Sequence, residues 1–149
     1  MPRPKSDRII HEPPLFSEFK PMGIPGRALE QIKLSLDEFE ALRLADHAGL
    51  SHEEAAKQLE ISRSTFTRLI RKARKKVADF MFLGKMLSIG GGNVHFKKNI
   101  IRCLDCRHEF RIDMNTSVRN CPACRSENLL NVAGGFGHGE CCWEKTEKK

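Results

Sequence analysis

Apolar side chains recur every three or four positions along residues 63–82, with polar and charged side chains between them. This periodicity predicts an amphipathic helix whose apolar side faces a protein core. Its apolar positions are Phe66, Leu69, Ile70, Ala73, Val77, Phe80 and Met81. We expect all seven to be buried, so any function of this helix belongs to its opposite, polar side.

Three serines in the preceding segments carry the signal of a helix start. Ser35, Ser51 and Ser62 each follow an apolar residue and can cap the first turn of a helix. These signals predict helices over 36–47, over 52–59 and from 63 onward. Because only the sequence "EIS" separates the last two, they are expected to cross steeply as a helix-turn-helix.

Charge is distributed very unevenly along the chain. The 149 residues carry 26 basic and 19 acidic side chains, a net charge of +7. Seven of the basic residues lie in segment 61–78, which has no acid, so 19 basic residues face 19 acidic ones elsewhere. A basic stripe confined to one helix is typical of nucleic-acid binding, whereas a solvated helix face usually mixes both signs.

In a helix-turn-helix, the first half of the second helix enters the major groove of double-stranded DNA and contacts base edges. Arginine can bind guanine through two hydrogen bonds, serine and threonine can bond to any base edge, and lysines further along contact phosphates. The free N–H groups at the helix start also suit a phosphate. The predicted DNA-binding residues are Ser62, Arg63, Ser64, Thr67, Arg68, Arg71, Lys72, Lys75 and Lys76.

Several motifs of residues 1–92 together resemble one known family. They are "MPRPKSDR", "FKPMGIP", "LSLDEFEALRLAD", "GLSHEEAAKQLEISRSTFTRLIRKARKKVAD" and "GKMLSI". The family consists of small, uncharacterised prokaryotic proteins described as predicted DNA-binding proteins, with a helix-turn-helix similar to the promoter-reading region of sigma factors. The resemblance implies DNA binding and transcription regulation. Its turn commonly carries glycine where this chain has Glu60, so either the turn avoids a positive φ or stability is lost.

The C-terminal part of the chain contains a different module. Cys103, Cys106, Cys121 and Cys124 form C-x₂-C-x₁₄-C-x₂-C, a spacing that lets four thiolates surround one ion. Flanking stretches "NIIRC", "HEFRI" and "LLNV" are predicted strands, so the segment resembles a zinc ribbon with one structural zinc ion. Iron in a rubredoxin-like site is the alternative, disfavoured because few aromatic residues surround the cysteines.

Other residues near the cysteines and at the chain ends are less informative. Arg107 and Arg125 stand where a knuckle often has glycine, and His108 is expected to be a surface residue because four cysteines already complete the site. His138, Cys141 and Cys142 lie in a glycine-rich tail that is expected to be disordered, with metal or redox sensing as the alternative. Arg3, Lys5 and Arg8 lie in a basic N-terminal arm that is either disordered or placed along a minor groove.

The predicted fold class is therefore a mainly α N-terminal helix-turn-helix domain plus a small β zinc-ribbon-like domain. We expect a sequence-specific DNA-binding protein that regulates transcription. A cytoplasmic location is expected because no apolar run reaches transmembrane length. A homodimer and a contact with RNA polymerase are further expectations, and a protein-interaction adaptor or metal- or redox-responsive regulator is the alternative. No catalytic constellation occurs, so an enzyme is not expected. The predicted divisions are an arm at 1–28, the helical domain at 29–89, a linker at 90–98, the cysteine module at 99–133 and a flexible tail at 134–149.

Overall fold

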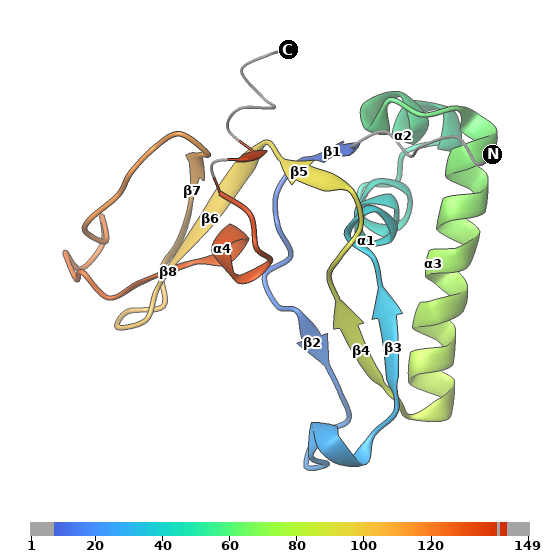
Figure 1. Cartoon of the computed structure of the whole chain (residues 1–149), viewed down its shortest axis with the longest axis horizontal. Helices are drawn as coiled ribbons and strands as arrows, with labels where there is room; N and C mark the ends of the chain where they lie inside the picture. The colour runs from blue at the N-terminus through green and yellow to red at the C-terminus, as the bar shows by residue number, and fades with distance from the viewer. Residues whose placement is uncertain (1–7, 140, 143–149) are drawn as a thin grey trace. The chain divides into compact units, whose positions relative to one another are not determined.

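The computed structural model describes residues 8–139 and 141–142 (Figure 1). These residues divide into two compact units, the first with Arg8 and Phe16–Val94, the second with Ile9–Leu15 and the described residues from His95 onward. β1 (Arg8–Ile10) and β5 (Val94–Phe96) pair in a two-stranded sheet. Predictions for Arg3, Lys5 and segment 143–149 lie outside the described residues.

The first unit contains a three-stranded sheet in the order β2 (Glu18–Phe19), β4 (Met86–Ile89) and β3 (Gln31–Leu34). β4 runs antiparallel to β2 and parallel to β3. Parallel neighbours need a long crossover connection, and all the longer helices of this unit lie in the crossover between β3 and β4. The sheet therefore joins the two ends of the helical segment.

Three helices of the first unit, α1 (Leu36–Leu42), α2 (His52–Leu59) and α3 (Arg63–Leu83), begin where the capping serines predicted. The 3₁₀ helix η1 (Gly26–Ala28) precedes them, and the π-helical η2 (Arg43–His47) continues α1. Ser35 accepts a 3.3 Å hydrogen bond from Glu38 N, and Ser51 and Ser62 each accept a 3.2 Å bond from the third helical N–H. The predicted helix starts are confirmed, and α1 and α2 both pack on α3.

The apolar side of α3 is buried in its first half and only partly covered in its second. Phe66, Ile70 and Ala73 are fully buried, as predicted. Met81 is 69% exposed, so its predicted burial was wrong. Met81 follows Arg63 by 18 residues, or five helical turns of about 3.6 residues. It therefore lies in line with Arg63, an exposed side chain at the border of the apolar face.

The second unit contains a three-stranded antiparallel sheet. β6 (Lys98–Cys103) lies between β7 (Glu109–Asp113) and β8 (Leu129–Asn131), which confirms the strands predicted beside the cysteines. The short helix α4 (Val132–Gly135) follows β8 and packs on β6. Asn99 Oδ1 on β6 accepts a 3.0 Å hydrogen bond from Ala133 N and so holds the start of α4.

The prediction of a mainly α protein with only a small β domain was wrong. Helices account for 37% and strands for 22% of the described residues, a mixed α/β fold with three sheets. The β2–β4–β3 sheet was missed because its strands span two to four residues, too few for an alternating pattern to be recognised. Every helix in the described part of the chain is too short or too polar to cross a membrane.

Candidate nucleic-acid interface and metal centre

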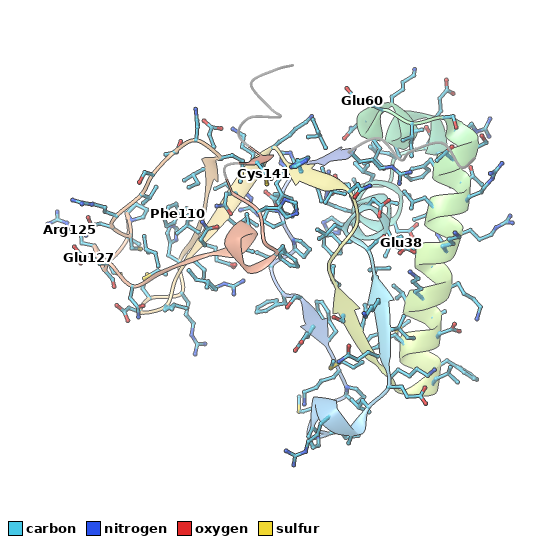
Figure 2. All side chains as sticks on the ribbon, in the orientation of Figure 1. Glu38, Glu60, Phe110, Arg125, Glu127 and Cys141 are labelled. Carbon is cyan, nitrogen blue, oxygen red and sulfur yellow. The ribbon has the colours of Figure 1, made fainter. Side chains whose placement is uncertain are left out.

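Four basic side chains in the first three turns of α3 are exposed. They are Arg63, Arg68, Arg71 and Lys72, and we call them the basic quartet. Within residues 8–139 and 141–142, none of the four forms an ion pair, whereas the other three basic residues of this helix do. Figure 2 shows side chains extending from α3 on the side away from β3 and β4. The quartet therefore presents four positive charges to solvent within three turns of one helix.

The remaining cations of α3 are paired within the first unit. Arg74 donates to both carboxylate oxygens of Asp46, at 3.1 and 2.7 Å, and this hydrogen bonding lowers the pKa of Asp46 and raises the pKa of Arg74. Lys75 contacts Asp79 at 2.8 Å, one helical turn further on. Since these pairs are exposed, water screens them, and breaking either pair costs little free energy.

Lys76 has a different, more buried partner. Its Nζ lies 2.6 Å from Oε1 of Glu38, a residue of α1 that is only 5% exposed (Figure 2). The same oxygen accepts a 3.1 Å hydrogen bond from Ser35 N, while Oε2 has no partner among the described residues. Removing Lys76 would leave a buried carboxylate uncompensated, so this lysine joins α3 to α1.

The polar residues at the start of α3 are held by local hydrogen bonds. Ser62 caps the helix and its hydroxyl donates to Thr65 Oγ1 at 2.7 Å, and Ser64 lies 3.3 Å from Ser62. Thr67 Oγ1 is 3.0 Å from Nδ1 of His52 on α2, in a half-buried position. Thr67 therefore joins the two helices, and Arg63, Ser64 and Arg68 are the exposed side chains of the first turns.

The turn between α2 and α3 contains a left-handed residue. Glu60 has φ 56° and ψ 42°, the conformation for which glycine is favoured, and its N–H bonds to Ala56 O and Lys57 O (Figure 2). The turn therefore does not avoid a positive φ at Glu60, which was one of the two possibilities for this position. The strain in a non-glycine residue there is about 1 kcal/mol.

A groove of about 610 Å³ lies beside the quartet in the first unit. Its charged lining includes two ion pairs, Arg8 with Asp37 and Lys76 with Glu38. Arg68 and Lys72 also line the groove, and they supply its excess positive charge. The groove is thus suited to an anionic ligand rather than an apolar one.

In the second unit, the structure brings Cys103, Cys106, Cys121 and Cys124 together, with all four sulfurs within 4.8 Å of one another. Cys103 Sγ is 3.5 Å from Cys124 Sγ, and Cys106 Sγ is 3.6 Å from Cys121 Sγ. Four sulfurs placed tetrahedrally at about 2.3 Å from an ion are about 3.8 Å apart. The cluster can therefore hold a metal ion.

The two cysteine turns have the same backbone structure. Arg107 N donates to Cys103 O at 2.9 Å, and Arg125 N donates to Cys121 O at 2.8 Å. Both arginines have positive φ, 64° and 63°, which accounts for the frequency of glycine at such positions. A hydrogen bond from the backbone N–H of Cys106 lowers the pKa of Cys103 to about 7, whereas the neighbouring cysteine side chains raise the pKa of Cys124 to about 12.

His108 follows Cys106 by two positions and is not among the residues whose donor atoms form the cluster. Its ring stacks on Phe110 with centroids 5.8 Å apart. Arg125 and Glu127 lie in the loop before β8 (Figure 2). A partly exposed aromatic pair thus lies at the start of β7, two to four positions after Cys106 in the chain.

A second group of donor atoms was only partly recognised from the sequence. His138, Cys141 and Cys142 were candidates, and the structure adds His95 of β5, with all four donor atoms within 4.8 Å of one another. Sequence spacing could not identify His95, because 47 positions separate it from Cys142. Figure 2 labels Cys141, the exposed member of the group.

Comparison with known proteins places these features in context. A family model described as "Protein of unknown function DUF134" matches residues 1–97. A "UPF0251 protein" of Chloroherpeton thalassium is 46% identical over 132 residues, covering 89% of this chain and 87% of the relative. One of Moorella thermoacetica is 39% identical, covering 95% and 93%, and one of Methanococcus vannielii is 50% identical, covering 64% and 74%. No solved structure matches the chain.

Proposed function

The chain belongs to the family described as "Protein of unknown function DUF134", and for this member we propose sequence-specific binding to double-stranded DNA in transcription regulation. The observation that carries the proposal is the basic quartet. Exposed cations close together on one helix, with no carboxylate partner in the described residues, suit a polyanion better than water alone. α2, the turn at Glu60 and α3 would act as a helix-turn-helix.

Within this proposal the residues of α3 have separate tasks. Arg63, Ser64 and Arg68 lie in the first two turns and would contact base edges in the major groove. Arg71 and Lys72 follow and would contact phosphates. Lys75 and Lys76 would bind phosphate only by giving up Asp79 and Glu38, so we assign them a smaller contribution than the quartet.

The N-terminus of α3 supports a phosphate contact of its own. Ser62 and Thr67 are engaged in the cap and in the contact with α2, so they would act by holding the helix rather than by reading bases. The first N–H groups of the helix and the positive end of its dipole favour a phosphate at this position.

For the four-cysteine cluster we propose one structural zinc ion. Four thiolates in a closed tetrahedral arrangement are the usual ligand set of structural zinc, and iron is the alternative ion for the same geometry. The module would form a zinc ribbon that serves as an accessory contact for DNA, for RNA polymerase or for a second copy of the chain.

A homodimer is favoured by the end of α3. Met81, Phe82 and Leu83 are 69%, 90% and 55% exposed, which is unusual for three consecutive large apolar residues. A second copy of the chain is the proposed occupant, because a single helix-turn-helix makes a small interface and dimers bind two half-sites. The same apolar residues would serve a protein-interaction adaptor, which is the alternative function.

Salt dependence of binding tests the proposal against this alternative. DNA fragments selected from a random pool are titrated with the full chain at several salt concentrations. Arg68→Ala is expected to weaken the selected site about tenfold or more and to relax the preference at one base pair. Arg71→Ala is expected to weaken selected and random DNA alike and to flatten the slope of log affinity against log salt by about 0.9.

Arg27→Ala is the matched control, since it removes one exposed arginine from η1 of the same unit and should leave the slope unchanged. DNA binding by α3 is contradicted if the Arg27, Arg68 and Arg71 variants have the same affinity and slope as the wild type. Sedimentation of the same samples gives the oligomeric state. A chain that selects no DNA but sediments as a stable oligomer would favour the adaptor.

A further inference from the structure

We propose that His95, His138, Cys141 and Cys142 form a second metal-binding site, separate from the four-cysteine cluster and suited to zinc. It is independent of the proposed DNA binding, because it concerns only side chains of the second unit. We call these four residues the His/Cys cluster. Its assignment follows from the distances between donor atoms, from the way the fold holds each residue, and from the chemistry of the ligand set.

The donor atoms of the His/Cys cluster have the separations of a tetrahedral site. Cys141 Sγ is 3.9 Å from Cys142 Sγ and 3.6 Å from His138 Nδ1. Cys142 Sγ is 3.3 Å from His138 Nδ1 and 3.6 Å from His95 Nδ1. With ligand distances of about 2.3 Å to sulfur and about 2.0 Å to nitrogen, a tetrahedron gives about 3.8 Å between sulfurs and about 3.5 Å between sulfur and nitrogen.

Adjacent cysteines normally direct their side chains apart, so this convergence requires a specific backbone. Cys142 N donates to Gly139 O at 3.0 Å, which turns the chain just before the second cysteine. Cys142 is fully buried, and its sulfur accepts a 3.3 Å hydrogen bond from Phe96 N on β5. Cys141 remains exposed, so one thiolate approaches the ion position from inside and the other from solvent.

Backbone and ring contacts also position the two histidines. His138 N donates to Ala133 O at 3.1 Å after a turn in which Gly137 has φ 78°. The His138 ring packs edge-on against Phe96, with centroids 5.0 Å apart, and lies 5.7 Å from the His95 ring. His95 lies on β5 between buried Val94 and Phe96, so strand alternation puts its ring on the other face.

Two thiolates with two imidazoles form a common ligand set of tetrahedral zinc. An ion there would connect β5 with the segment at 138–142, since Cys142 and His95 are 47 positions apart. Such a connection closes a long loop and thereby stabilises the folded second unit. The site thus gives the glycine-rich end of this unit a structural role.

The number of bound metal ions tests this proposal in the full chain. The protein is purified with zinc, and bound zinc per chain is measured by elemental analysis. The wild type is expected to hold two ions, and Cys141→Ser and His138→Gln are expected to hold one. Both substitutions leave buried Cys142 in place, and His47→Asn, which alters an exposed histidine of the first unit, should keep two ions.

Cobalt substitution identifies which site loses its ion. Imidazole is a stronger-field ligand than thiolate, so the cobalt bands of the His/Cys cluster should lie at higher energy than those of the four-cysteine cluster. The higher-energy bands should vanish in the Cys141 and His138 variants and persist in a Cys103→Ser, Cys106→Ser double variant. A second ion that survives Cys141→Ser, a wild type whose single ion is lost with Cys103 and Cys106, or a disulfide between Cys141 and Cys142 would each overturn the proposal.

Discussion

The two units of the chain are built on different principles. The core of the first unit consists of large apolar side chains from helices and strands, such as Leu36, Leu44 and Phe66. Three of the buried residues of the second unit are cysteines, and both groups of possible metal donors lie there. From this comparison we propose that apolar packing holds the first unit, whereas the second would depend on bound ions because so short a chain buries little apolar surface.

Removal of metal is expected to have the largest effect and to act on the second unit alone. Chelation of the ion of the four-cysteine cluster removes a binding free energy of about 10–16 kcal/mol. This is more than the unfolding free energy expected of so small a module. We therefore expect β6 and β7 to lose protection from hydrogen exchange while α3 keeps it. Mass spectrometry of exchanged amides in the full chain measures both regions at once.

The double substitution Cys103→Ser, Cys121→Ser should reproduce the chelated state, and added zinc should restore the chelated wild type but not this variant. If α3 and β6 lose protection together, the two units do not differ in the way proposed. If neither loses protection, the cysteine turns are stable without an ion.

The converse change should destabilise the first unit and spare the second. Phe66→Ala removes a fully buried ring at the start of α3, which costs about 3–5 kcal/mol of unfolding free energy. Denaturation followed by far-ultraviolet circular dichroism measures the loss. Bound zinc per chain should not change.

Met22→Ala is the matched control in the same unit, because that side chain is 99% exposed and its loss should alter stability by less than about 0.5 kcal/mol. Equal destabilisation by the two substitutions would mean that the loss in Phe66→Ala does not come from the burial of its ring. A loss of zinc in Phe66→Ala would instead show that the units fold together.

The difference between the units also explains which features could be predicted from the sequence. Signals that act over a few residues were sufficient: the capping serines located the helices, and the C-x₂-C pairs located a cluster that can hold metal. The β2–β4–β3 sheet was not predictable in this way, because Lys33 and Ser88 pair across the whole helical segment. Its parallel register depends on tertiary packing rather than on local sequence.

The candidate sites show the same limit. The basic quartet was identifiable from charge and period, but the sequence did not show that Lys75 and Lys76 pair with Asp79 and Glu38. His95 has no local signal, since a histidine between Val94 and Phe96 is equally typical of a strand with one exposed face. Only the fold brings it to Cys142.

The smallest expected effect concerns non-glycine residues whose backbone has a positive φ, and each unit has at least one of them. Glu60 in the first unit and Arg125 in the second have φ of 56° and 63°. Glu60→Gly should raise the unfolding free energy of the first unit by up to about 1 kcal/mol, because glycine adopts this conformation without strain from Cβ. Arg125→Gly should give a similar gain, seen as tighter zinc binding.

Each glycine substitution therefore reports on one unit only, and this makes the pair a sensitive test of their independence. Glu60→Gln and Arg125→Lys keep Cβ and should give no gain, which separates backbone strain from side-chain contacts. Denaturation midpoints of α3 and zinc affinity, measured on all four variants, should move independently. If Glu60→Gly tightens zinc binding as much as it stabilises α3, folding of the first unit is coupled to metal binding in the second, and the contrast between apolar packing and metal binding does not divide the chain.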